Sequence, residues 1–124
     1  MMSTKLDQFH AYRERMNARI LDTGTLETRR FFALDTRTYE EGALSVRTKE
    51  LLGLVASAVL RCDDCITYHL VQSARAGVTR AEMVEALNVA LVVGGSIVIP
   101  HLRRAYETMD ELAVAPGPAE STAD

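Results

Sequence analysis

The sequence predicts an all-α fold, a bundle of about six helices in one domain. Apolar side chains recur at helical spacing along most of the 124 residues, and no segment alternates apolar and polar residues as a strand would. The composition agrees, because Ala, Leu, Glu and Arg are abundant and only 6% of residues are aromatic. We expect residues 1–113 to form this domain and residues 114–124 to form a flexible tail.

Capping and turn residues mark the helix boundaries. Glycine-containing turns follow the first two helices, and Ser45 is placed to cap the third. Gly77 is placed to end the fourth helix, and the capping-box sequence from Thr79 to Glu82 opens the fifth. Pro100 suits the first turn of the sixth. The predicted helices cover residues 3–21, 26–40, 46–60, about 65–76, 79–93 and 100–112.

Two segments are unusually apolar. Eight of the ten residues from Leu51 to Leu60 are apolar, so we expect partner subunits to help the core bury the third helix. The second segment runs from Ala86 to Pro100 and is predicted to be a buried helix end. It is too short, and too often interrupted by polar and glycine residues, to span a bilayer.

Composition and charge exclude several classes of protein. A net charge of −3 argues against a general nucleic-acid binder, which neutralises phosphates with Lys and Arg. No secretory leader or membrane span is evident, so we expect a cytoplasmic location with no membrane partner. Neither a GxGxxG fingerprint nor a P-loop occurs, and no cofactor is expected.

Both cysteines lie in one CxxC motif, Cys62–Cys65, where the fourth helix is expected to begin. Residues three and four apart share a helix face, so the spacing directs Cys62, Cys65 and His69 to one patch. Free backbone N–H groups at a helix start stabilise a thiolate, which is the form that attacks peroxides and disulfides. A CxxC pair also allows a reversible disulfide.

Carboxylates surround this motif. Asp63 and Asp64 would disfavour a thiolate if they pointed at the sulfurs, but we expect them to cap the fourth helix. Glu50 is the only carboxylate between Glu41 and Asp63. It is either a solvent-facing acid of a first helical turn or a partly buried acid that exchanges protons with a thiol or imidazole.

Together these residues resemble a known signature. Glu50, eleven intervening residues, Cys62, two residues, Cys65, three residues and His69 are similar to the motif of the alkylhydroperoxidase D-like branch of the carboxymuconolactone decarboxylase family. The similarity extends from about Ala43 to the Gly94–Gly95 segment. It implies an all-helical fold that assembles as a homo-oligomer, a trimer or a hexamer.

The resemblance also implies roles for the site residues. Carried over from peroxidase members, Cys65 attacks the hydroperoxide, Cys62 resolves the sulfenic acid, and Glu50 with His69 forms a proton relay. A dithiol protein or a lipoyl-type donor would then reduce the disulfide. One position departs from the pattern, since some members carry histidine where this chain has Asp64. That removes one relay member and places a carboxylate beside the attacking sulfur.

Three alternatives remain open. The namesake of the family acts on a carboxylated lactone, and the CxxC argues against that activity. A redox sensor without peroxidase activity is the second, because a cysteine pair can be purely structural or slowly oxidised. A metal site is the third, although structural zinc sites commonly need a second ligand pair. Its candidate ligands are Cys62, Cys65 and His69, with Glu50, His10 or His101 as a fourth. His101 is otherwise predicted to be an ordinary polar residue of a first helical turn.

Overall fold

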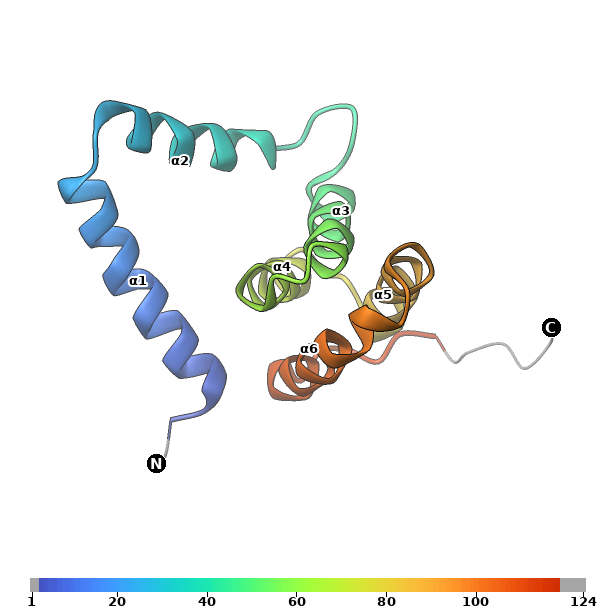
Figure 1. Cartoon of the computed structure of the whole chain (residues 1–124). Coiled ribbons are helices and arrows are strands. Elements are labelled where there is room, and N and C mark those ends of the chain that lie inside the picture. The colour runs from blue at the N-terminus through green and yellow to red at the C-terminus, as the bar shows by residue number, and fades with distance from the viewer. Residues whose placement is uncertain (1–2, 119–124) are drawn as a thin grey trace. The chain divides into compact units, whose positions relative to one another are not determined.

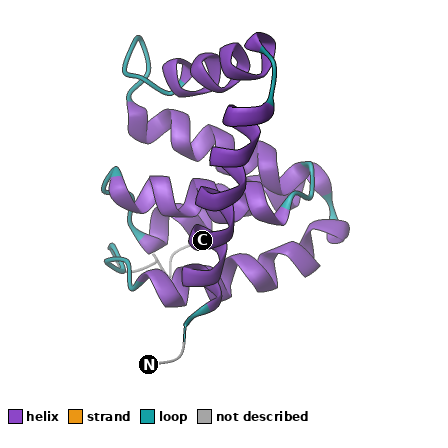
Figure 2. Ribbon diagram, turned by 90° about the vertical axis from the view of Figure 1, so that its left-hand side faces the viewer, coloured by secondary structure: helices purple, strands orange, loops and turns teal. Residues whose placement is uncertain are grey.

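The structure, a computed structural model, describes residues 3–118 (Figure 1). Helices and loops account for all of these residues, with no strand among them (Figure 2), which confirms the predicted all-α class. The helices are α1 (Lys5–Thr23), α2 (Leu26–Thr38), α3 (Val46–Val59), α4 (Asp63–Arg75), α5 (Arg80–Gly94), the 3₁₀ helix η1 (Ser96–Val98) and α6 (Ile99–Leu112). Every predicted helix is present, and each of its ends lies within two residues of the predicted position; η1 was not predicted.

The chain divides into two compact units, residues 1–41 and 42–124. The first contains α1 and α2. Each begins with a capping box, in which Thr4 and Thr25 exchange hydrogen bonds with the residue three positions later. Neither helix contains a buried residue, so capping and local pairs, rather than a core, define this unit.

The second unit contains α3 to α6 and the hydrophobic core. The α3 helix packs against both α4 and α5, and α4 also packs against α6. The buried core residues come from all four helices and from the segments that join them: Leu54, Ala58, Ile66, Leu70, Val78, Met83, Leu87, Ala90, Val98, Ala105 and Met109. The apolar faces of α3 and α4 therefore meet in a packed layer, which fixes the register between their polar residues.

The predicted caps are in place. Ser45 accepts a hydrogen bond from the Thr48 N–H at the start of α3, and Gly77 follows α4 with a φ of 85°. At the start of α5, the Arg47 guanidinium and the Thr79 N–H and hydroxyl all donate to Glu82. These donors lower the pKa of Glu82 from its usual 4.5 to about 2.

The predicted tail starts beside α5. The Arg80 N–H donates to the Ala115 carbonyl at 2.8 Å, and the Ala81 N–H donates to the Pro116 carbonyl at 3.0 Å. The Ala115 and Pro116 carbonyls thus accept hydrogen bonds from N–H groups in the first turn of α5, which have no acceptor within the helix. Residues 119–124 of the predicted tail lie outside the described residues.

The apolar segment from Ala86 to Pro100 departs from its prediction. It was expected to be a buried helix end, but Val92 is 85% exposed and Val93 is 68% exposed. Val89 and Ile97 are also exposed, because only one face of α5 meets α3. Within residues 3–118, no helix has the length and apolar character needed to cross a membrane.

Candidate functional site

A tight turn joins α3 to the CxxC motif. Arg61 has a φ of 60°, in the left-handed region where glycine is usual. Its N–H donates to the Ala58 carbonyl at 3.1 Å, and the Cys62 N–H donates to the Ser57 carbonyl at 3.0 Å. This pair of bonds is the Schellman arrangement, which ends α3 and directs the chain straight into α4.

The two cysteines form a disulfide within the first turn of α4. Their Cα atoms lie 5.3 Å apart. Cys62 is the N-cap residue, and its Sγ accepts a hydrogen bond from the Cys65 N–H at 3.3 Å. The expectation that Asp63 and Asp64 cap this helix is therefore wrong. Cys62 has the extended backbone that a cap requires, whereas both aspartates already lie inside the first turn.

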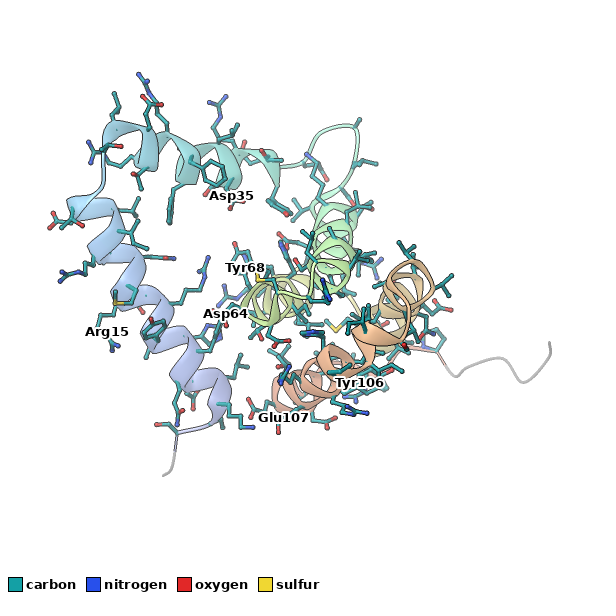
Figure 3. All side chains as sticks on the ribbon, viewed as in Figure 1. Arg15, Asp35, Asp64, Tyr68, Tyr106 and Glu107 are labelled. Carbon is teal, nitrogen blue, oxygen red and sulfur yellow. A yellow bond between two sulfur atoms is a disulfide. The ribbon has the colours of Figure 1, made fainter. Side chains whose placement is uncertain are left out.

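Exposure differs across this turn. Cys65 is exposed and Cys62 is half-buried. Asp64 and Tyr68, four residues apart, project from the same side of α4 (Figure 3). The Tyr68 ring is half-buried and meets the His69 ring edge-on, with 5.2 Å between ring centroids. The disulfide is thus reachable from solvent at Cys65, while the following turn of the helix is packed.

Glu50 and His69 form a buried pair between α3 and α4. Glu50 is 3% exposed and His69 is 8% exposed. The His69 Nδ1 lies 2.9 Å from Glu50 Oε2. Of the two interpretations of Glu50, the solvent-facing acid is wrong, because the apolar layer of α3 and α4 encloses its carboxylate.

A glycine makes room for this pair. A Cβ atom at Gly53, one turn after Glu50 on α3, would lie 2.6 Å from Cε1 and 2.8 Å from both ring nitrogens of His69. The imidazole therefore lies directly against the α3 backbone. When Nδ1–H donates to the carboxylate, Nε2 carries the lone pair and is the atom able to take or return a proton.

A second carboxylate–imidazole pair was missed by the sequence argument. Asp63 Oδ1 lies 2.7 Å from His101 Nδ1, and its Oδ2 accepts from Arg104 at 2.9 Å. Both partners come from the first turns of α6. The available signal was the spacing of His101 and Arg104, three residues apart and so on one helix face. Only the packing of α4 against α6 identifies their partner.

The metal-site alternative gains no support from this geometry. Among the residues that the structure describes, no group of three or more His, Cys, Asp or Glu side chains could hold a metal ion. His101, one proposed fourth ligand, is engaged with Asp63. The proposed cysteine ligands are joined to each other.

Comparison with known proteins identifies the family of the chain. Residues 26–119 match the model of the carboxymuconolactone decarboxylase family. The chain belongs to the carboxymuconolactone decarboxylase family. The match covers α2 to α6 and includes the disulfide, the Glu50–His69 pair and the Asp63 cluster.

Solved structures of family members agree. A Thermotoga maritima member, for which involvement in an antioxidative response has been suggested, is 57% identical, with a TM-score of 0.82 over 86% of this chain and 90% of that one. A Legionella pneumophila member, 24% identical, shares the fold, with a TM-score of 0.82 over 90% and 99% of the two chains.

Two curated relatives are less similar in sequence to this chain than the Thermotoga maritima member is. A protein of the cox locus of Paracoccus denitrificans, which has no assigned function, is 32% identical over 66% of this chain and 74% of its own length. An uncharacterised Cupriavidus necator protein is 29% identical over 59% and 65%. Family membership thus supports an enzyme-like or antioxidant role in general terms.

Proposed function

We propose that this protein is a dithiol peroxidase that reduces hydroperoxides through Cys65 and Cys62. The observation that carries the proposal is the arrangement of the first two turns of α4. A disulfide occupies the helix start, and an imidazole held by a buried carboxylate follows Cys65 by four residues. The antioxidative role suggested for the Thermotoga maritima relative points in the same direction.

The chemistry follows from these groups. The Cys65 thiolate attacks the hydroperoxide, forming an S–O bond as the O–O bond breaks, and the departing alkoxide takes a proton to become an alcohol. His69 Nε2 takes the proton that the Cys65 thiol loses on forming the thiolate and returns it to the alkoxide, while Glu50 holds the ring in place. Such general acid help contributes on the order of 10²–10⁴ in rate. The Cys62 thiol then attacks the sulfenic sulfur, closing the disulfide, and its proton leaves with the hydroxyl group as water. An external dithiol returns two electrons and two protons.

The first experiment reduces the disulfide, removes the reductant, and then measures the thiol count and intact mass before and after one equivalent of cumene hydroperoxide. We expect rapid loss of two thiols and of the mass of two hydrogen atoms per chain. Cys65→Ser should abolish consumption, and Cys62→Ser should allow one turnover and leave a trappable sulfenic acid. Unchanged thiols would overturn the proposal. Turnover of a carboxylated lactone by the double cysteine variant would overturn it in favour of the decarboxylase alternative.

The relay has its own test. Glu50→Gln and His69→Gln should slow peroxide consumption but leave disulfide formation by a strong oxidant intact, because only the proton transfer from Cys65 to the departing alkoxide needs them. Full peroxidase activity in both variants would remove the relay from the mechanism. Arg75→Gln, on the same helix and exposed, provides a control for a polar change of α4 away from the pair.

We infer that a second copy of the chain covers the exposed face of α5. Val89, Val92 and Val93, with Asn88, line a shallow hollow of about 290 Å³. An apolar patch on an isolated subunit favours association. Sedimentation should show a homo-oligomer, and Val92→Asp should dissociate it. A monomeric native protein at micromolar concentration would refute this inference.

A further inference from the structure

The Asp63 cluster joins the CxxC turn to α6. Asp63 follows Cys62 directly, and each of its carboxylate oxygens has one partner, His101 at 2.7 Å and Arg104 at 2.9 Å. The side chain of His101 is 17% exposed and that of Asp63 is 38% exposed, whereas the Arg104 side chain is 62% exposed. The cluster therefore closes over an imidazole that is mostly packed and leaves the guanidinium at the surface.

Asp63 lies between the two cysteines in the sequence, and the Arg104 guanidinium of the cluster offsets its negative charge. A carboxylate between two cysteines disfavours their thiolates, because like charges repel. Reduction of the disulfide near neutral pH creates such a thiolate. A cation on the carboxylate offsets the repulsion, and hydrogen bonds from α6 hold the carboxylate toward that helix.

The neighbouring residues provide an internal comparison. Asp64 lies between the same two cysteines and is exposed, and Arg103 adjoins Arg104 and is also exposed. Within residues 3–118, neither takes part in an ion pair or side-chain hydrogen bond of the kind that Asp63 and Arg104 make. Asp64 and Arg103 therefore serve as matched controls, outside the cluster, for Asp63 and Arg104 inside it.

We propose that His101 and Arg104 are positioning residues of the redox pair, which act through Asp63 to favour the reduced state of Cys62 and Cys65. Arg104 supplies the offsetting charge, and His101 orients the carboxylate from its mostly buried position. The inference rests on the proposed function only in taking the cysteine pair to be redox-active. It adds α6 to the groups that control the pair.

The test is an equilibrium with dithiothreitol at pH 7, without peroxide. The Cys62–Cys65 bond breaks and takes two electrons and one proton, which leaves one thiol and one thiolate, while dithiothreitol closes to its cyclic disulfide and releases its other proton to the buffer. Alkylation followed by intact mass gives the ratio of dithiol to disulfide. Arg104→Ala should shift this ratio toward the disulfide by about three- to tenfold, the latter being about 30 mV for two electrons. Arg103→Ala, the matched control, should leave it within about twofold, because an exposed charge without a fixed partner is strongly screened.

Two further variants show whether Arg104 acts through Asp63. In an Asp63→Asn background, Arg104→Ala should lose most of its effect, whereas in an Asp64→Asn background it should keep it. His101→Ala should shift the ratio in the same direction as Arg104→Ala, and Arg104→Lys should preserve the native ratio. Equal effects of Arg104→Ala and Arg103→Ala, or an undiminished Arg104→Ala effect in Asp63→Asn, would overturn the inference.

The outcome is separable from that of the peroxidase test. A protein inert toward cumene hydroperoxide that still shows the Arg104 shift would refute the proposed function alone. A protein that consumes hydroperoxide but shows no such shift would refute this inference alone. Near-ultraviolet circular dichroism of each variant verifies that the native packing is retained.

Discussion

The Glu50–His69 pair provides a demanding test of how α3 and α4 are held together. For an ionised pair 2.9 Å apart, Coulomb's law gives an attraction of about 6 kcal/mol at an effective dielectric constant of about 20. Desolvation offsets most of this, because the two side chains are only 4% and 10% exposed. Removing the histidine should therefore cost more stability than neutralising the glutamate, whatever the net free energy that the intact pair contributes.

His69→Phe keeps a ring of similar size against Gly53 but leaves the Glu50 carboxylate buried without its donor. Breaking a buried pair in this way costs about 3–5 kcal/mol of the free energy of unfolding. Glu50→Gln keeps a carbonyl oxygen that can accept from Nδ1–H, so its cost is about 1 kcal/mol. The double variant should be more stable than His69→Phe alone, because no buried carboxylate remains.

The assay is urea unfolding of the native protein and the three variants at pH 7. Excess reductant keeps the disulfide open, so it contributes to the free energy of unfolding of none of the four proteins. The slope with urea should stay constant across the set while the midpoints move. An additive double variant, or a His69→Phe cost below that of Glu50→Gln, would refute the reasoning. Either result would mean that the carboxylate is hydrated or has another donor in solution.

Three shorter predictions follow from other contacts. The pKa of Glu82 lies at about 2 in the fold, below its usual 4.5, so its ionised form stabilises the protein above about pH 4.5, and this contribution disappears as the pH falls toward 2. Glu82→Gln should therefore flatten the acid-denaturation curve in that window, and so should loss of its partner in Arg47→Ala. Gly53→Val should displace the His69 ring and slow peroxide consumption while far-ultraviolet circular dichroism stays helical, since a Cβ alone would lie 2.6 Å from Cε1; unaltered kinetics would contradict the ring placement. Leu54→Ala, at a fully buried position, should lower the free energy of unfolding by about 2–5 kcal/mol in urea titrations, and a cost under 1 kcal/mol would place Leu54 outside the core.

Local chemistry explains why the helices were predictable. Ser45 and the Thr79–Glu82 box cap through bonds between residues three positions apart, and Gly77 ends α4 through its own backbone conformation. Each is determined within one turn of chain. The start of α4 was less accessible, because a cysteine at the N-cap displaced the aspartates that propensity favours.

Relations between helices were harder to predict. The resemblance to a family motif predicted that Glu50 and His69 act together, and the structure brings their side chains into contact. It left His101 as an ordinary polar residue, because nothing local indicates that α6 reaches Asp63. The exposure of Val92 was missed for the same reason, since an apolar helix face looks alike whether its own chain or another covers it.

The short span of the disulfide has a consequence for the working life of the protein. Cys62 and Cys65 are separated by three positions, so the bond closes a small ring inside one turn and joins no two helices. Chain entropy attributes only about 2 kcal/mol to so short a loop. The layer formed by α3, α4 and α5 needs no such cross-link, because its packing comes from apolar side chains. Opening the bond should therefore leave the helices packed, so the redox cycle that we propose for the two sulfurs would not expose the chain to unfolding or proteolysis.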